Sequence, residues 1–217
     1  MLLLSMDKLI LTDVDGVLLN WEYAFGTWME EHGHIKIDNG NFIYNMGKRY
    51  GIDIAEAGKL IRYFNESATI GFLPALRDAE HYVKLLGNLG YRFHAITSLS
   101  KDPNAQRLRT KNLTKLFGNV FEKYIYLDTG EDKDAVLAHY KDSNLLWIED
   151  KPANAAAGLK CGLNSVIMEH AFNLHYEGAA PLVKNWSEIY NMVTSNSVSS
   201  EINGAFDDRL SYQDLFK

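Results

Sequence analysis

The most informative part of this 217-residue chain lies near its start and reads Lys8-Leu9-Ile10-Leu11-Thr12-Asp13-Val14-Asp15-Gly16-Val17-Leu18. Residues 8–12 form a short, mostly apolar run, which is typical of a buried strand in a parallel sheet. Asp13 and Asp15 follow where that strand ends, and Gly16 allows the chain to turn sharply beside them. The stretch therefore predicts a buried strand that carries two carboxylates at its carboxyl end.

From residue 76 onward, helical and strand patterns alternate along the chain. The expected helices cover residues 76–88, 103–116, 133–140 and 153–160, and the expected strands cover 91–96, 124–127, 145–148 and 165–168. This alternation predicts an α/β fold with right-handed crossovers and a Rossmann-like parallel sheet. In such sheets ligands bind beyond the carboxyl ends of the strands. Polar pairs at two further strand ends, Thr97-Ser98 and Glu149-Asp150, are thus expected to meet Asp13 and Asp15.

Residues 21–72 interrupt the alternation directly after the first strand. Helical patterns over 22–32, 41–50 and 54–66 predict a small helical cap, and Asp53 suits the N-cap of the last of these. We expect residues 8–20 and 73–193 to form the core. We also expect residues 194–217, which are rich in serine, to form a polar and mobile tail.

Composition excludes several classes of protein. Hydrophobic residues make up 47% and charged residues 23%, which is typical of a globular chain. The net charge of −6 speaks against general binding to nucleic acid, and no run approaches the ~18 apolar residues of a membrane span. The single cysteine, Cys161, rules out a disulfide within the chain and favours a reducing, cytoplasmic location. Composition gives no indication of the oligomeric state.

The stretch Asp13-Val14-Asp15-Gly16-Val17-Leu18 resembles the first motif of the haloacid-dehalogenase (HAD) superfamily. Three further pieces follow in the order of that family: Thr97 ends a strand, Lys133 precedes the last acidic strand, and Glu149-Asp150 with Asn154 is similar to the fourth motif. The resemblance covers roughly residues 8–170. It implies a HAD core with a helical cap inserted after the first strand.

The resemblance also implies a reaction, the hydrolysis of a small phosphate ester with the help of Mg²⁺. Asp13 would attack phosphorus and form an aspartyl-phosphate, while Asp15 would act as general acid and then as general base. Thr97 and Lys133 would stabilise the oxygens of the phosphoryl group. The carboxylates of Asp13 and Asp150, together with the main-chain carbonyl of Asp15, would bind Mg²⁺, a cation that prefers oxygen ligands.

Some positions depart from the family pattern or leave alternatives open. The fourth motif often contains two aspartates, whereas here it has Glu149 before Asp150 and the neutral Asn154 after it. Arg109 and Lys111 lie on the helix after Thr97 and compete with Lys133 as the cation that binds phosphate. Substrate-binding roles are also expected for Gly16, which lets the chain turn beside the phosphate, and for Ser98.

Within the superfamily the chain is similar to the 5′(3′)-deoxyribonucleotidase group. The shared pieces are Asp13 to Trp21, Thr97-Ser98 with Lys101 close behind, Leu116-Phe117-Gly118, Asp132-Lys133, and Asn185 to Ile189. In that group an aromatic residue at the position of Trp21 helps to form the base pocket. The resemblance implies that Trp21 stacks on a nucleobase, and packing within the cap is the alternative.

Two other functions stay open at this stage. A HAD phosphotransferase or mutase would pass the phosphoryl group to a sugar instead of water, with the same residues. A signalling receiver also uses acidic strand ends, a threonine and a lysine on a parallel sheet. Receivers have ~120 residues and lack a helical insertion after the first strand, so the spacing of Asp13, Asp15 and Gly16 and the expected cap disfavour that interpretation.

Overall fold

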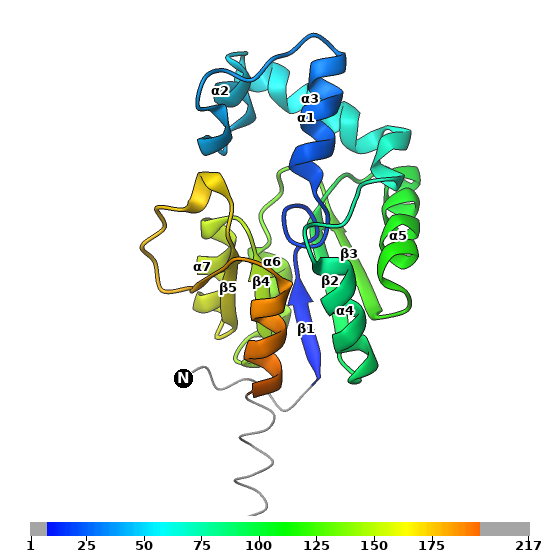
Figure 1. Ribbon diagram of the computed structural model, residues 1–217, viewed down its shortest axis with the longest axis vertical. Coiled ribbons are helices and arrows are strands. Elements are labelled where there is room, and N and C mark those ends of the chain that lie inside the picture. The colour runs from blue at the N-terminus through cyan, green and yellow to red at the C-terminus, as the bar shows by residue number, and fades with distance from the viewer. Residues whose placement is uncertain (1–7, 196–217) are drawn as a thin grey trace, which may run out of the picture.

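The computed structural model describes residues 8–195 and shows one six-stranded sheet (Figure 1). The strands are β1 (Leu9–Thr12), β2 (Arg92–Ser98), β3 (Phe121–Leu127), β4 (Leu146–Glu149), β5 (Asn164–Met168) and β6 (Leu182–Val183). Their order in the sheet is β3-β2-β1-β4-β5-β6, and every neighbouring pair is parallel. This confirms the Rossmann-like α/β fold, in which the order reverses at β1. The short edge strand β6 was not predicted.

The helices follow the predicted pattern with shifts at their ends. They are α1 (Trp21–Glu31), α2 (Met46–Tyr50), α3 (Ile54–Glu66), α4 (Ala79–Asn88), α5 (Pro103–Phe117), α6 (Asp134–Leu137) and α7 (Pro152–Lys160). Short 3₁₀ turns cover η1 (Gly40–Phe42), η2 (Ala68–Gly71), η3 (Ala138–Tyr140) and η4 (Ala171–Asn173). Asp53 caps α3 as expected, because its carboxylate accepts the main-chain N–H groups of Ala55 and Glu56.

Several boundaries differ from the prediction. The helix expected over 41–50 is divided into η1 and α2, because residues 43–45 are not helical. The helix expected from residue 76 begins at Ala79, and the strand expected from 124 begins at Phe121. The helix expected over 133–140 is divided into α6 and η3. Residues 186–195 are helical, so residues 194 and 195 belong to a helix, while the rest of the expected tail lies outside the described residues. No helix within residues 8–195 combines the length and apolar composition that a bilayer crossing requires.

The central strands β1 and β4 are buried on both faces, which explains why they are mostly apolar runs without a polar side. Ile10 of β1 packs in the larger core cluster with side chains from α4, α5 and the helical residues 186–195. Its neighbour Leu11 points to the other face and packs with Leu137 and Trp147. Successive residues of a strand point to opposite faces, so both must be apolar when helices cover both sides.

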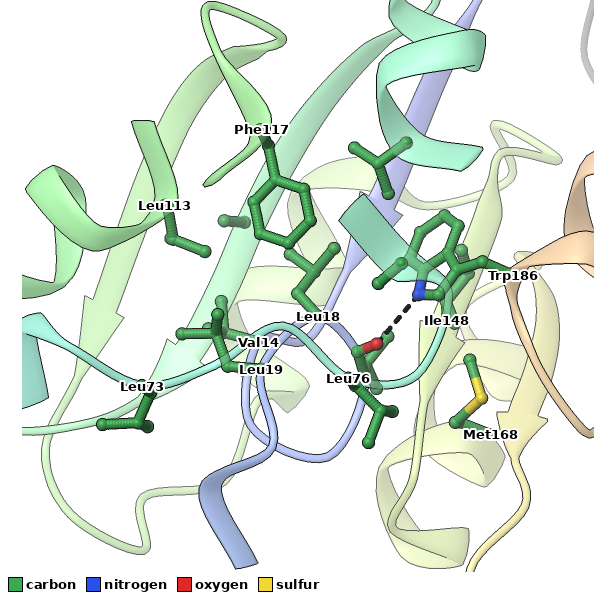
Figure 2. Close-up of a cluster of buried hydrophobic side chains, with 14 of the residues drawn as sticks. Val14, Leu18, Leu19, Leu73, Leu76, Leu113, Phe117, Ile148, Met168 and Trp186 are labelled. Atoms are coloured by element: carbon green, nitrogen blue, oxygen red, sulfur yellow. Dashed lines mark hydrogen bonds between the residues drawn. The ribbon is translucent and has the colours of Figure 1, made fainter. Parts of the chain in front are cut away.

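The loop after β1 is part of the core despite its irregular backbone. Val14, Leu18 and Leu19 are fully buried, and Figure 2 shows them within a cluster that also contains Phe117 and Trp186. The indole N–H of Trp186 donates to the carbonyl oxygen of Val17 at 2.8 Å. The packing therefore fixes the loop that carries the two carboxylates.

Helices α1 to α3 lie beyond the carboxyl ends of the strands (Figure 1). Several contacts join them to the sheet. The Arg62 side chain of α3 forms an ion pair with Asp128 at 2.9 Å, and the Asn65 amide donates to the carbonyl of Leu99. Residues 21–72 thus lie where a cap over the strand ends would lie. The division into core and cap stays a prediction.

Candidate active site

Asp13 lies at the end of β1 beside a buried lysine. One oxygen of its carboxylate, Oδ1, is 2.7 Å from Nζ of Lys133, and only 7% of Asp13 is exposed. The same Nζ is 2.7 Å from Oε1 of Glu149, which ends β4. Because β1 and β4 are paired in parallel, their carboxyl ends bring Asp13 and Glu149 together around one cation.

Glu149 is fully buried, and both of its carboxylate oxygens accept hydrogen bonds. Oε1 accepts from Lys133 and from the amide of Asn154 at 2.6 Å. Oε2 accepts the main-chain N–H groups of Asp150 and Lys151 at 2.8 and 2.7 Å. Glu149 therefore orients Lys133 and fixes the turn that places Asp150.

Asp150 packs directly against Gly16, which explains the glycine in the first motif. Gly16 has φ of +78°, and a Cβ atom at this position would overlap the Asp150 carboxylate. Both the backbone conformation and the available space therefore require glycine here. This close packing brings the Asp150 side chain against the loop that follows Asp13.

Asp15 is held by an arginine from a distant helix. Oδ1 of Asp15 is 2.6 Å from Nη1 of Arg109, which lies on α5 and is fully buried. Arg109 is not among the residues that line the cavity, so the structure places it on Asp15 and not on a phosphate position. Lys111, the other candidate on this helix, is exposed and does not line the cavity. Lys133 is therefore the candidate cation that lies next to Asp13.

Thr97 and Ser98 end β2 and line the same cavity. The hydroxyl oxygen Oγ1 of Thr97 is buried and has no hydrogen-bond partner within the described residues. Such an unpaired buried hydroxyl is costly, and an incoming oxygen would satisfy it. The Ser98 hydroxyl already donates to the carbonyl of Glu131 at 2.7 Å.

A cavity of about 310 Å³ opens above these groups. Its floor contains Asp13, Asp15, Gly16, Thr97, Lys133 and Asp150, and its roof comes from residues 20–65. Trp21 lines the roof, where its ring stacks on Phe25 with centroids 4.5 Å apart. The indole N–H of Trp21 donates to Asn65 at 2.9 Å, which fixes the plane of the ring.

His170 and Lys151 also line the cavity, although sequence analysis assigned no role to either. Nε2 of His170 is 2.6 Å from the carbonyl oxygen of Gly16, so this ring nitrogen carries the proton and donates. Residues 16 and 170 are too far apart in the chain for spacing to reveal this contact. Lys151 directly follows Asp150, and this proximity to the fourth motif was the available signal.

Burial and crowding shift the pKa values of the acidic cluster. Burial raises the pKa of Asp13 to about 7, although the Lys133 ammonium opposes this rise. Burial and the neighbouring carboxylates raise the pKa of Asp150 as well. Burial would also raise the pKa of Glu149, but Lys133 and the hydrogen bonds that Glu149 accepts hold it below its ordinary value. The cluster thus resists carrying three negative charges unless another cation is present.

The donor set fits a hard divalent cation. Carboxylate oxygens of Asp13, Glu149 and Asp150 lie within 4.8 Å of one another. Glu149 is occupied by four hydrogen bonds, so Asp13 and Asp150 are the better ligands. Among the described residues, the cavity lining contains more acidic than basic side chains. The carboxylates are Asp13, Asp15, Glu22, Glu131, Glu149 and Asp150, and the lysines are Lys133 and Lys151. Oxygen ligands with excess negative charge are what Mg²⁺ binds in proteins.

Comparison with solved structures identifies the fold. A haloacid dehalogenase-like hydrolase from Streptococcus pneumoniae superposes with a TM-score of 0.60 at 15% identity, covering 88% of this chain and 98% of that one. The chain has the HAD fold. CbbY from Rhodobacter sphaeroides, solved with phosphate, shares this HAD fold with a TM-score of 0.55 and 17% identity, over 85% of this chain and 96% of that one.

Sequence comparison adds one curated relative of unknown activity. Over 153 residues the chain is 29% identical to an uncharacterized 32.4 kDa protein of Enterobacteria phage T4, which covers 67% of this chain and 54% of that protein. The chain thus spans about half the length of this relative. No family model matches the sequence. The HAD fold therefore rests on the structural similarity and on the order of the motifs.

Proposed function

We propose that this protein is a Mg²⁺-dependent phosphomonoesterase that acts through an aspartyl-phosphate on Asp13. The observation that carries this proposal is the position of the Asp13 carboxylate at a strand end. It is held 2.7 Å from the Lys133 ammonium, beside Asp150, on the floor of a cavity of about 310 Å³. A carboxylate in such a site is a nucleophile, with positive charge next to the place where a phosphoryl group would lie.

The first step transfers the phosphoryl group to the protein. An oxygen of Asp13 forms a bond to phosphorus while the bond from phosphorus to the ester oxygen breaks. The Lys133 ammonium and the unpaired Thr97 hydroxyl donate to the phosphoryl oxygens. Asp13 and Asp150 would hold Mg²⁺, and a bound Mg²⁺ would offset the negative charge of the phosphate so that an anionic nucleophile could approach.

Asp15 moves the protons in both steps. It lies two residues beyond the nucleophile, lines the cavity, and is fixed by Arg109 at 2.6 Å. In the first step it donates a proton to the departing ester oxygen. In the second step it takes a proton from the water that attacks the phosphorus of the aspartyl-phosphate, which releases phosphate and restores Asp13.

A nucleoside monophosphate is the substrate that we favour within this class. One face of the Trp21 indole packs on Phe25, and Asn65 holds its N–H, so the ring is a fixed wall of the cavity. A fixed aromatic wall suits a planar group attached to the phosphate. We also place the protein in the cytoplasm, in keeping with its single cysteine, Cys161.

Phosphate release tests the proposal. Nucleoside 5′- and 3′-monophosphates, sugar phosphates and an aryl phosphate are incubated with Mg²⁺ or with EDTA. We expect Mg²⁺-dependent release that Asp13→Asn abolishes. Asp132→Asn is the matched control, because that side chain is 79% exposed and does not line the cavity, and it should retain full activity.

Trapping the intermediate separates hydrolysis from other uses of the site. A ³²P-labelled ester should leave label on the wild-type protein that hydroxylamine removes, as expected for an acyl phosphate. Undiminished turnover by Asp13→Asn would refute the assignment of the nucleophile. Labelling without release of phosphate would point to transfer to another acceptor.

A further inference from the structure

We infer that the cavity selects phosphate monoesters whose leaving group carries hydrogen-bond donors and no second anionic group, with Glu22 as the residue that sets this preference. The inference rests on the proposed function and specifies the class of substrate. It follows from how charge is distributed between the two ends of the cavity.

Within residues 8–195, the lysine and arginine side chains that line the cavity all lie at its sheet end. Lys133 and Lys151 are the cations in its lining, and both lie next to the carboxylates at the strand ends. The roof is formed by Asn20, Trp21, Glu22, Tyr44, Asn45, Met46, Ile61 and Asn65. Its single charged group is thus the Glu22 carboxylate, on the first turn of α1.

Glu22 is fixed in place by an arginine that the cavity does not reach. Nη1 of Arg49 is 2.7 Å from Oε1 of Glu22, and 28% of the Glu22 side chain is exposed, against 1% for Arg49. Nε of Arg49 donates to the carbonyl oxygen of Ile43 at 2.7 Å. The remaining nitrogen, Nη2, is buried away from solvent. A second phosphate would therefore meet the carboxylate and not the guanidinium.

This roof suits neutral polar groups. The free lone pairs of Glu22 accept hydrogen bonds, and Asn20 and Asn45 line the cavity beside it. Hydroxyl and amino groups of a sugar or nucleoside would satisfy these partners. A second phosphate would meet the Glu22 carboxylate, which lines the cavity, and not Arg49, which does not. The ion pair with Arg49 offsets part of the repulsion, but in a partly desolvated site the nearer like charge still weakens binding by about tenfold.

The HAD fold itself does not impose this selection. A mutant of CbbY from Rhodobacter sphaeroides was solved in complex with xylulose 1,5-bisphosphate, at a TM-score of 0.55 to this chain. That fold can therefore hold a bisphosphate. In the present chain the residues between β1 and β2 determine the charge of the roof, so selection against a second phosphate would be a property of this insertion.

Binding measurements test the inference without relying on turnover. Calorimetry on Asp13→Asn protein with Mg²⁺ compares a hexose 6-phosphate with the matching hexose 1,6-bisphosphate. We expect the bisphosphate to bind at least about tenfold more weakly. Adding Glu22→Gln should narrow that ratio to about threefold or less, because the repelling charge is removed while the side chain keeps its size and the Arg49 guanidinium loses its counter-charge.

Glu30→Gln is the control variant, since it removes the same charge from an exposed position of the same helix. It should leave the ratio unchanged. Equal binding of the two esters by the Asp13→Asn protein would overturn the inference and leave the phosphatase proposal intact. A ratio that Glu22→Gln does not alter, in protein with an unchanged circular dichroism spectrum, would overturn the role of Glu22. Absence of binding of either ester would overturn the inference, whereas the proposed function would still be decided by phosphate release from the nucleoside monophosphates with the wild-type protein.

Discussion

Replacing Lys133 by methionine should strongly destabilise the protein at neutral pH. Lys133 is 2% exposed and bonds the carboxylates of Asp13 and Glu149 at 2.7 Å each. Methionine fills most of the same volume, so the change removes the charge with little loss of packing. Asp13, Glu149 and Asp150 would then remain together, without a counter-ion, within 4.8 Å of one another.

The expected loss follows from the cost of an unpaired buried charge. Removing one partner of a buried ion pair costs about 3–5 kcal/mol. For a domain of about 150–250 residues, each kcal/mol shifts the thermal midpoint by about 2–4 °C. The midpoint should therefore fall by about 6–20 °C. Mg²⁺ should stabilise the variant more than the wild type, because it replaces the missing positive charge. At a Mg²⁺ concentration about one hundred times the Kd of the variant, binding should stabilise the variant by about 2.7 kcal/mol.

Thermal unfolding measures the change in midpoint, and urea unfolding with and without Mg²⁺ measures the change in free energy. Lys151→Met is the matched control, because Lys151 is 31% exposed and its Nζ lies 4.0 Å from Asp132. Exposed pairs of this kind contribute about 0–1 kcal/mol, so the control should unfold nearly as the wild type does. A loss below about 1 kcal/mol for Lys133→Met would contradict the reasoning, since it would mean that the carboxylates do not depend on Lys133.

Three further predictions concern the same site. Gly16→Ala places an alanine at φ of +78° and its Cβ against the Asp150 carboxylate. The free energy of unfolding should therefore fall by at least about 1–2 kcal/mol, and the affinity for Mg²⁺ should fall as well. An unchanged free energy of unfolding and an unchanged Kd for Mg²⁺, both measured by calorimetry, would contradict this. Mg²⁺ affinity should rise by at least about tenfold per pH unit below the Asp13 pKa of about 7, because a raised pKa keeps that carboxyl group protonated there and protons compete with the metal. The raised pKa of Asp150 adds to this rise, and a Kd that does not vary with pH would refute the prediction. Arg109→Met should lower kcat by up to about a hundredfold with little change in KM, because Asp15 loses the partner that positions it; steady-state kinetics with unchanged kcat would show that Asp15 needs no such support.

Local patterns were sufficient to predict the elements that build the site. The apolar run before Asp13 indicated a buried strand, and helical spacing with Asp53 as cap gave α3 with both of its observed ends. These signals depend on neighbours a few residues apart, so they can be read from sequence alone. The boundary between α6 and η3 escaped prediction, because a single turn leaves no such periodic signal.

The HAD motifs also indicated which strand ends carry polar groups, but they did not give the partners of each group. Arg109 and Lys133 were both candidates for the phosphate cation. The structure pairs Arg109 with Asp15 and places Lys133 between Asp13 and Glu149. Helical spacing says which face a side chain occupies, whereas its partner depends on how that helix packs against the sheet.

The sequence by itself determined the alternation of strands and helices from β1 to β5, the acidic strand ends and the helical stretch between β1 and β2, since each of these rests on the local pattern of polar and apolar residues. Only the tertiary structure decided that the Asp150 carboxylate packs against Gly16, where no Cβ atom would fit. It also decided that His170 donates a hydrogen bond to the Gly16 carbonyl and that Arg49 forms an ion pair with Glu22 on the cavity wall. Two of these three contacts join residues more than a hundred positions apart. These two contacts arise because the carboxyl ends of distant strands meet at one edge of the sheet, and no local spacing records them.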